Sequence, residues 1–405
     1  MGQVAAEVPS GASDGGEWTK ASALIVALCF ALNMADGMDV LVVSFIAPSL
    51  QSQWGVSPAE LSMVFSMGLA GMAVGGLGLA PLADRFGRRR MVAVAMGLMA
   101  VAMAVSSFTR SVPELAAVRF VVGIGIGTVL ACIAAIAARV SPPKHRNFSV
   151  GVLQAGYPIG AMLTGFVTAW ALPHYGWQNV LLATSLVSAL FVPAILLVLP
   201  AGLDGAAGAT QKAPLREVMA GERLPNSIRL WIAAICGFMA LYFITSWITK
   251  LSIEAGLPQT QAIIASAIYN FGAFTGTVAM SLLGTRADVK ILCSTLLGLT
   301  TAVFLVFGGV PMPLAGVLGT AFIMGVTLQG GFNMLYPLAA QVYPDRVRAT
   351  GIGWTFGIGR IGAFTGPLLG GWALGQHWSL LAIFALFCGP LALAAVAVRG
   401  VKPAN

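Results

Sequence analysis

Residues 21–49 read ASALIVALCFALNMADGMDVLVVSFIAPS, and Asp36 and Asp39 are the only charged side chains in this stretch. Almost all of its other residues are apolar, and the run is long enough to cross about 30 Å of hydrocarbon as a helix. An ionised carboxylate is costly at that depth, so charged residues inside membrane spans usually serve a function. The stretch therefore predicts a membrane-spanning helix that carries a functional acid pair.

The composition extends this prediction to the whole chain. Of 405 residues, 58% are hydrophobic and only 9% are charged, whereas soluble domains carry about 25% charged residues. Five cysteines lie far apart within apolar runs, a pattern typical of small apolar fillers rather than disulfides or metal ligands. We therefore expect an all-α polytopic membrane protein without a metal or another cofactor.

Apolar runs of spanning length recur from end to end of the chain. They predict twelve transmembrane helices, at 21–49, 58–82, 91–108, 114–138, 147–171, 178–200, 230–252, 260–283, 291–308, 313–340, 349–374 and 378–399. Lysines and arginines gather in every second loop, and such loops face the cytoplasm. The distribution predicts a multi-pass protein with both termini cytoplasmic, and it explains the net charge of +8 without a nucleic-acid partner.

The longest polar stretch after the N-terminus, residues 201–229, divides the chain into two halves of six spans each. We expect a disordered tail at 1–20, helical bundles at 21–200 and 230–399, a cytoplasmic loop between them and a short tail at 400–405. An offset of 202 residues aligns parts of the two halves, and this suggests two pseudo-symmetric bundles. The matching pairs are Val140/Val342, Pro142/Pro344, Lys144/Arg346, Arg146/Arg348 and Gly151/Gly353.

The loop LADRFGRRR at 82–90 resembles the signature loop of the major facilitator superfamily. Because the charged residues of this loop lie outside the membrane core, we expect a cytoplasmic gate or interhelix lock rather than a substrate site. The matching gate residues are Asp84, Arg85, Gly87, Arg88 and Arg89, while Ala80 replaces the first glycine of the motif.

Three further stretches resemble one family within that superfamily, the aromatic acid/proton symporters. They are DGMD at 36–39, RFVVGIGIG at 119–127 and YPDRVRATGIGWTFGIGRIGAFTGPLLGG at 343–371. Members of the family import benzoate, hydroxybenzoates, protocatechuate, muconate or phenylpropanoid acids together with protons. The resemblance implies a monomeric carrier in the bacterial inner membrane that serves the breakdown of aromatic compounds.

The charges inside the predicted spans suggest how such a carrier works. Asp36 and Asp39 share one helix face, and Arg119 lies at a compatible depth for pairing with them. Arg360 lies near mid-depth of a predicted span in the other half. In that half, the offset of 202 aligns Phe238 with Asp36. We expect proton coupling at the two aspartates and Arg119, and binding of the substrate carboxylate by Arg360. The resemblance implies the same four positions.

Polar residues in other spans are further candidates for contact with the substrate. These candidates are Asn33, Gln154, Tyr157, Tyr269, Asn270, Gln329, Asn333 and Tyr336. An aromatic substrate also needs a pocket of rings. Phe30, Tyr157, Phe271, Phe332 and Trp354 are candidates for it.

Several alternatives stay open at this point. The four buried charges could be structural ion pairs. The cargo could be another small organic acid, such as muconate or a phenylpropanoid acid, and the direction could be efflux by antiport. An enzyme is not expected, because no nucleophile–base or metal-ligand pattern occurs and His145, His174 and His377 fall in loops.

Overall fold

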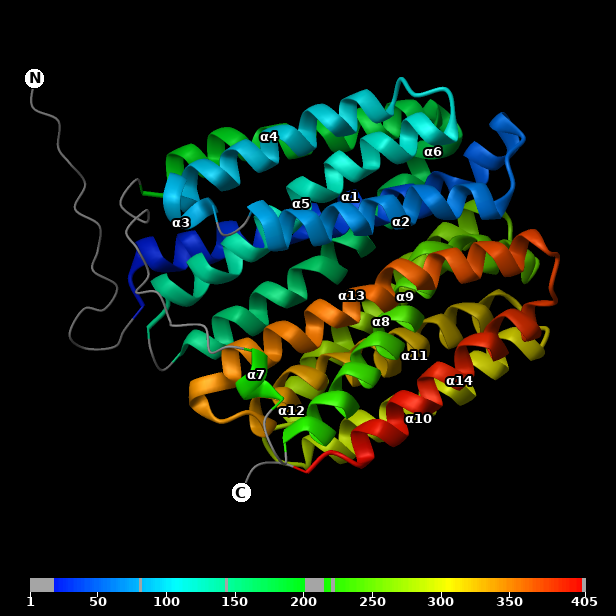
Figure 1. Cartoon of the computed structure of the whole chain (residues 1–405). Helices are drawn as coiled ribbons and strands as arrows, with labels where there is room; N and C mark the ends of the chain where they lie inside the picture. Colours follow the sequence, from blue (N-terminus) through cyan, green and yellow to red (C-terminus); the bar gives the residue numbers. More distant parts are fainter. Residues whose placement is uncertain (1–17, 80–81, 143–144, 201–214, 220–222, 403–405) are drawn as a thin grey trace, which may run out of the picture. The chain divides into compact units, whose positions relative to one another are not determined.

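The computed structural model describes residues 18–79, 82–142, 145–200, 215–219 and 223–402 (Figure 1). Most of the predicted tails and central loop, as well as Ala80 and Lys144, lie outside these ranges. The first half contains α1 Lys20–Trp54, α2 Pro58–Val74, a π-helical turn Gly75–Leu79, α3 Ala83–Phe86, α4 Arg88–Ser106, α5 Val112–Val140 and α6 Arg146–Val198. The second half contains α7 Leu215–Val218, α8 Arg223–Glu254, α9 Gln259–Leu283, α10 Val289–Gly309, α11 Leu314–Asn333, α12 Leu335–Val342, α13 Asp345–Gly375 and α14 Leu380–Arg399.

Among the described residues, ten helices are long and apolar enough to cross a membrane. That number counts residues 151–198 once, although α6 contains a non-helical residue, Gly176, that separates two predicted spans. It also leaves out α13, whose 31 residues are long enough to span but have a lower mean hydropathy because they include many glycines and Arg360. The structure thus agrees with twelve spans, all of them helical.

Two breaks within these helices have local causes. Gly176 has a φ of 75°, which glycine adopts readily because it has no Cβ. The second break separates α11 from α12 at Met334. Pro337 has no N–H to donate to the carbonyl of Asn333, so the helical ladder is interrupted there. The sequence predicted the first break, as the boundary between the spans 147–171 and 178–200, whereas the second falls inside the predicted span 313–340.

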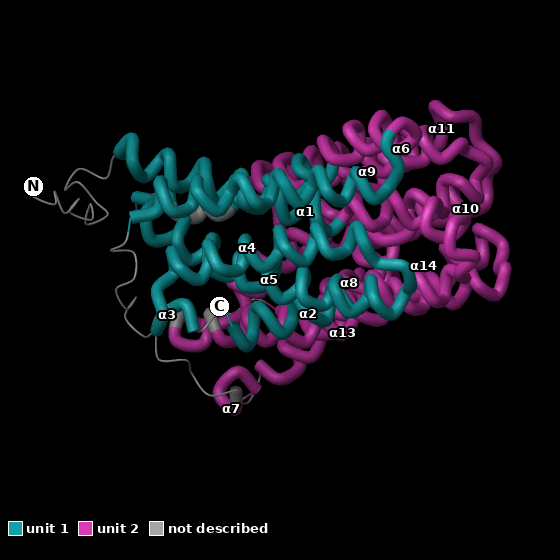
Figure 2. The backbone as a smooth tube through the Cα atoms, turned by 90° about the horizontal axis from the view of Figure 1, so that it is seen from above, with its two compact units in different colours: residues 1–40, 67–161, 175–209 teal, residues 41–66, 162–174, 210–405 magenta. Residues whose placement is uncertain are grey.

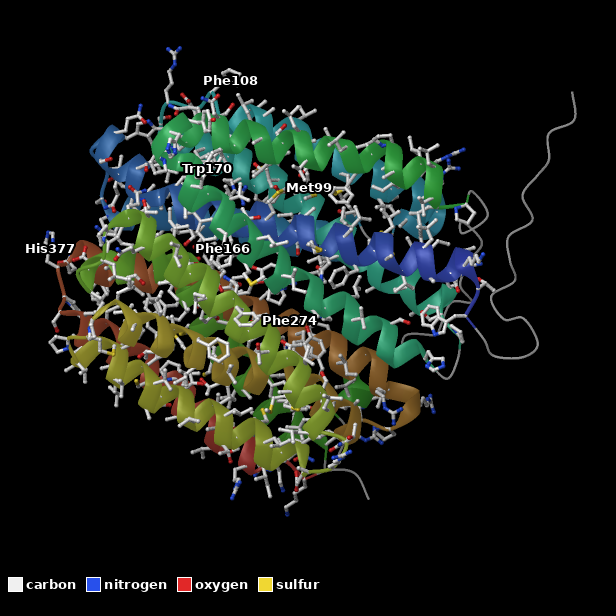
Figure 3. All side chains as sticks on the ribbon, turned by 180° about the vertical axis from the view of Figure 1, so that it is seen from behind. Met99, Phe108, Phe166, Trp170, Phe274 and His377 are labelled. Atoms are coloured by element: carbon white, nitrogen blue, oxygen red, sulfur yellow. The ribbon has the colours of Figure 1, made fainter. Side chains whose placement is uncertain are left out.

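The chain divides into two compact units, coloured separately in Figure 2. Unit 1 comprises residues 1–40, 67–161 and 175–209, and unit 2 comprises residues 41–66, 162–174 and 210–405. Within unit 1, α4 and α5 pack against each other, and Met99 (Figure 3) lies against Gly125. Within unit 2, the closely packed pairs are α8 with α13, α9 with α11 and α10 with α14.

Close backbone contacts repeat in the two halves of the sequence. A Cβ at Gly160 in α6 would collide with the backbone of Met34 in α1. A Cβ at Gly362 in α13 would collide in the same way with Ile235 in α8. The contact of α2 with α5 recurs between α9 and α11. There the matching glycine–carbonyl pairs are Gly71/Phe120 with Gly272/Phe322, and Gly75/Ile124 with Gly276/Val326.

These contacts support two pseudo-symmetric six-helix bundles and refine the alignment between them. The offset is 202 residues for α5 with α11 and for α6 with α13, as the sequence suggested. It is 201 residues for α1 with α8 and for α2 with α9. The expected offset is therefore wrong by one on the first helix, and Gly237, rather than Phe238, corresponds to Asp36.

Large apolar side chains are exposed along the helices, as a lipid environment requires. Phe108, Phe166 and Trp170 project from the ribbon in Figure 3, and 72%, 42% and 61% of their surfaces are exposed. In water such residues would favour aggregation, whereas in a bilayer they are at no disadvantage. The chain is a multi-pass membrane protein.

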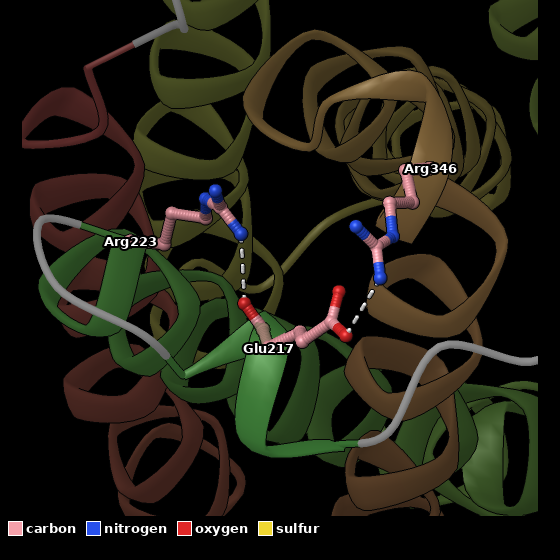
Figure 4. A network of polar contacts seen from close by, with 3 residues as sticks. All are labelled: Glu217, Arg223 and Arg346. Atoms are coloured by element: carbon pink, nitrogen blue, oxygen red, sulfur yellow. Dashed lines mark hydrogen bonds and ion pairs between the residues drawn. The ribbon is translucent and has the colours of Figure 1, made fainter.

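Glu217 of the short helix α7 ties part of the central loop to unit 2 (Figure 4). Arg223 of α8 donates to the Glu217 backbone carbonyl at 2.8 Å, and Arg346 of α13 donates to its carboxylate at 3.2 Å. Nearby, the Tyr343 hydroxyl donates to Ser227 Oγ at 3.0 Å. These bonds hold α7 against the ends of α8 and α13 that carry the basic residues.

Candidate functional site

Unit 1 contains what we call the acidic cluster, formed by Asn33, Asp36, Asp39, Arg119 and Ser188. Asp36 and Asp39 lie one turn apart on α1 and are only 2% and 0% exposed. Arg119 of α5 is also buried, and its charge acts on both carboxylates. Its Nη2 donates to the backbone carbonyl of Asp39 at 2.8 Å. The structure thus brings together the three residues to which the sequence assigned proton coupling.

Two other side chains hold the cluster in place. Ser188 Oγ of α6 donates to Asp39 Oδ2 at 3.2 Å, and Asn33 Nδ2 donates to the carbonyl of Leu153. Among the described residues, none hydrogen-bonds to Asp39 Oδ1. Sequence reasoning missed Ser188, although it is one of few hydroxyl residues in the apolar span 178–200.

The glycine between the two aspartates fixes where α1 meets α6. A Cβ at Gly37 would collide with the carbonyl of Tyr157, so the two backbones touch at this point. Tyr157 is half-buried beside this contact, whereas Gln154 is exposed one turn earlier on α6. Phe30, a predicted ring-pocket residue, packs against Gly156 in the same contact.

Unit 2 contains what we call the arginine–aromatic cluster, formed by Phe238, Tyr242, Phe332, Tyr336, Phe356 and Arg360. The guanidinium carbon of Arg360 lies 5.6 Å from the centroid of the Phe238 ring, within reach of a cation–π interaction. Phe238 in turn lies 4.5 Å from Phe332 and 5.8 Å from Tyr242, centroid to centroid. Tyr336 stacks on Phe356 at 3.7 Å with an interplanar angle of 10°.

The packing of this cluster depends on the absence of a side chain at Gly237. A Cβ added there would lie only 2.9 Å from the Phe332 ring. Because Gly237 corresponds to Asp36, the second half has an aromatic ring near the place where the first half has a carboxylate. The two halves share a packing plan but present different chemistry.

Arg360 has no anionic partner among the described residues. No described carboxylate lies within ion-pair distance of it, and its Nη1 has no hydrogen-bond acceptor in the described part of the chain. The Arg360 side chain is half-buried, and Tyr336 lies close enough for an electrostatic interaction with the guanidinium. A cation within a span favours a counter-ion, so this arrangement suits a bound carboxylate.

Three of the predicted polar residues belong to α11 and α12. Gln329 Nε2 donates to Asn333 Oδ1 at 3.2 Å, and Asn333 Nδ2 donates to Thr277 Oγ1 of α9 at 2.8 Å. Tyr336 lies one turn beyond and is 37% exposed. By contrast, Tyr269 and Asn270 of α9 are 1% and 2% exposed, so they offer no open surface to a ligand.

Sequence reasoning identified only part of the aromatic surroundings of Arg360. Phe332 belongs to the cluster, whereas Phe271 pairs with Phe322 at 5.6 Å and Trp354 is 42% exposed. The ring pocket predicted from the sequence did not include Phe238, Tyr242 and Phe356. Phe356 could have been found, because it precedes Arg360 by one helical turn.

The predicted gate residues lie around the junction of α3 and α4 in unit 1. Gly87 adopts a φ of 95°, which allows the sharp turn between the two helices. Arg89 Nη2 donates to the carbonyl of Leu196, near the end of α6. Arg85 is exposed and Arg88 half-buried, while the side chain of Asp84 lies outside the described residues. In the described chain, no group of three His, Cys, Asp or Glu residues could hold a metal ion.

Comparison with known proteins shows the family to which the chain belongs. The sequence profile of the Major Facilitator Superfamily matches residues 28–315. The chain is 30% identical to the gallate transporter of Pseudomonas putida, over 93% of this chain and 90% of that protein. It is 29% identical to the 4-hydroxybenzoate transporter PcaK of Pseudomonas aeruginosa, over 92% and 91% of the two chains.

A solved structure agrees on the fold. The nucleoside transporter NupG superposes with a TM-score of 0.78 at 13% identity, over 94% of this chain and all of that chain. The chain belongs to the major facilitator superfamily and, within it, to the family of aromatic acid transporters. It is a transporter and not an enzyme.

Proposed function

We propose that this protein imports an aromatic carboxylate together with protons across the bacterial inner membrane, with both termini in the cytoplasm. The observation that carries the proposal is Arg360, a half-buried guanidinium with no described anionic partner, set among aromatic rings. A planar guanidinium can hold both oxygens of a carboxylate, and the ring of Tyr336, which is 37% exposed, can face an aromatic ring. One ligand, an aromatic acid, satisfies both features.

The acidic cluster supplies the coupling in this proposal. Asp39 Oδ1 receives no hydrogen bond among the described residues, so it can carry a proton without displacing a donor. Arg119 stabilises the ionised form of the same carboxylate. Ser188 and the Asn33–Leu153 bond keep the groups in place while the proton comes and goes. Protonation of Asp39 then accompanies the change between inward- and outward-facing states.

The driving force follows from the charge that crosses the membrane. Each unit of pH difference supplies about 1.4 kcal/mol per proton. One proton with a monoanion carries no net charge, whereas a second proton adds about 2.3 kcal/mol per 100 mV of membrane potential. Two adjacent aspartates are compatible with either stoichiometry.

The test is uptake by proteoliposomes of labelled benzoate, 4-hydroxybenzoate, protocatechuate and a phenylpropanoid acid, with muconate for comparison. We expect accumulation of at least one aromatic acid under an inward proton gradient, and none in Asp39→Asn or Arg360→Ala. Accumulation of muconate alone would keep the mechanism and remove the aromatic cargo. Export driven by the same gradient would indicate an antiporter. Variants that transport like the wild type would show that the charges are structural.

A further inference from the structure

The hydrogen-bond chain on α11 defines a polar group beside the arginine–aromatic cluster. Thr277 Oγ1 donates its only hydrogen to the carbonyl of Ala273 at 2.8 Å, so it can only accept from Asn333. Asn333 must therefore present Nδ2 to Thr277 and Oδ1 to Gln329. Gln329 in turn donates through Nε2, which leaves its carbonyl oxygen, Oε1, at the end of the chain. The direction of the whole chain follows from one helical carbonyl.

Oε1 of Gln329 has capacity for a ligand. No group in the described part of the chain hydrogen-bonds to it, while the residue is half-buried. Its immediate neighbours on α11, Leu328 and Gly330, are both buried. Polar side chains in a membrane span face the bundle interior or water rather than lipid. Oε1 is thus a hydrogen-bond acceptor without a partner in the described part of the chain.

The helical register places Gln329 beside the cluster. Gln329, Phe332 and Asn333 of α11 follow the i, i+3, i+4 spacing of a single helix face, and Tyr336 lies on α12, just beyond the break at Met334. Phe332 and Tyr336 both belong to the arginine–aromatic cluster. Gln329 therefore lies on the same face of α11 as Phe332, about 4.5 Å from it along the axis.

Arg360 lies near Phe332, because the Phe238 ring contacts both residues. α12 and α13 are joined by only two residues and pack against each other, so their directions are opposite. Tyr336 stacks on Phe356, so these two residues lie at the same level. One helical turn along α13 from Phe356 to Arg360 therefore runs in the same direction as one turn back from Tyr336 to Phe332. Gln329 is then about 4.5 Å further along the axis than Arg360. This axial offset is within the length of a benzene ring with one substituent at each end.

From this geometry we infer that Gln329 selects acids whose ring carries a hydrogen-bond donor remote from the carboxylate, such as a phenolic hydroxyl. The inference rests on the proposed function, since it assumes that Arg360 holds the carboxylate. The O–H group donates to Gln329 Oε1, and the Asn333–Thr277 bonds keep that oxygen in position. A ring without a donor leaves Oε1 without a partner once water is displaced, and such losses disfavour the wrong ligand.

The experiment compares ring substituents in binding to the purified protein and in uptake by proteoliposomes. The probes are benzoate, 2-hydroxybenzoate, 4-hydroxybenzoate, 4-aminobenzoate and 4-methoxybenzoate. We expect 4-hydroxybenzoate and 4-aminobenzoate, which can donate, to bind about three- to ten-fold more tightly than the other three. The methoxy compound has similar bulk but no donor, so it separates hydrogen bonding from shape.

The matching variant is Gln329→Leu, with Gln376→Leu at an exposed position on the end of α13 as its control. We expect Gln329→Leu to bind 4-hydroxybenzoate and benzoate about equally tightly. We expect Gln376→Leu to keep the wild-type preference for 4-hydroxybenzoate. A preference that survives in Gln329→Leu, or a wild type that binds benzoate and 4-methoxybenzoate equally well, would overturn the inference and leave the proposed function standing. Failure to bind any of the five acids would overturn the inference, and failure to accumulate any acid of the uptake panel above would overturn the proposed function as well.

Discussion

Replacing Arg360 separates a substrate-binding arginine from a structural one. A carboxylate held by two charge-assisted hydrogen bonds gains about 1.5–3 kcal/mol from each in a protein interior. Arg360 is half-buried, so partial hydration reduces the sum to about 3 kcal/mol. Arg360→Met should therefore weaken substrate binding by about 100-fold. Arg360→Lys keeps the charge but loses the planar fork, and it should weaken binding by about ten-fold.

Thermal stability in detergent supplies the second measurement. Because Arg360 has no described anionic partner, Arg360→Met removes a partly desolvated cation and should leave the melting temperature unchanged or higher. The control is Arg348→Met, since Arg348 Nε donates to the carbonyls of Ala340 and Tyr343 at 2.9 and 3.2 Å. That exposed residue should contribute about 1 kcal/mol, so its loss should lower the melting temperature.

The assay is isothermal titration of the purified variants, with melting followed in parallel. A variant Arg360→Met that melts earlier and still binds the acid would refute the reasoning. It would show that Arg360 belongs to a structural contact and that the carboxylate is held elsewhere.

Three further predictions follow from the same structure. Asp39→Asn should abolish accumulation driven by a proton gradient but keep exchange of labelled for unlabelled substrate at equal pH; loss of exchange as well would mean that the residue binds substrate. Arg119→Met leaves two buried carboxylates without their cation and should lower the free energy of unfolding by about 3 kcal/mol. Part of this loss should return when Asp39→Asn is added. A melting curve of Arg119→Met like that of the wild type would contradict this prediction. Gly362→Val places a side chain against the Ile235 carbonyl and should prevent stable packing of α8 with α13. The control is Gly357→Ala, whose added methyl group meets no neighbouring atom, so this variant should express normally. Equal expression of the two variants would contradict this packing.

Local properties of the sequence account for the parts that it predicted. The number of spans follows from runs of apolar residues, because a helix must satisfy its backbone within itself when no water is available. Asp36, Asp39 and Arg119 stand out for the same reason, since each is a charge in an otherwise apolar stretch. The break at Gly176 and the one near Pro337 are likewise visible as residues that cannot continue a regular helix.

Tertiary structure alone determined which side chains meet. Ser188 reaches Asp39 from a helix that is distant in sequence, and Phe238 reaches Arg360 in the same way. The order of the Gln329–Asn333–Thr277 chain depends on a contact between α9 and α11. The offset of 201 residues between α1 and α8 emerged only from the glycine contacts. Hydropathy places a residue in the membrane, but packing sets the rotation and register of each helix, and these decide which groups share a site.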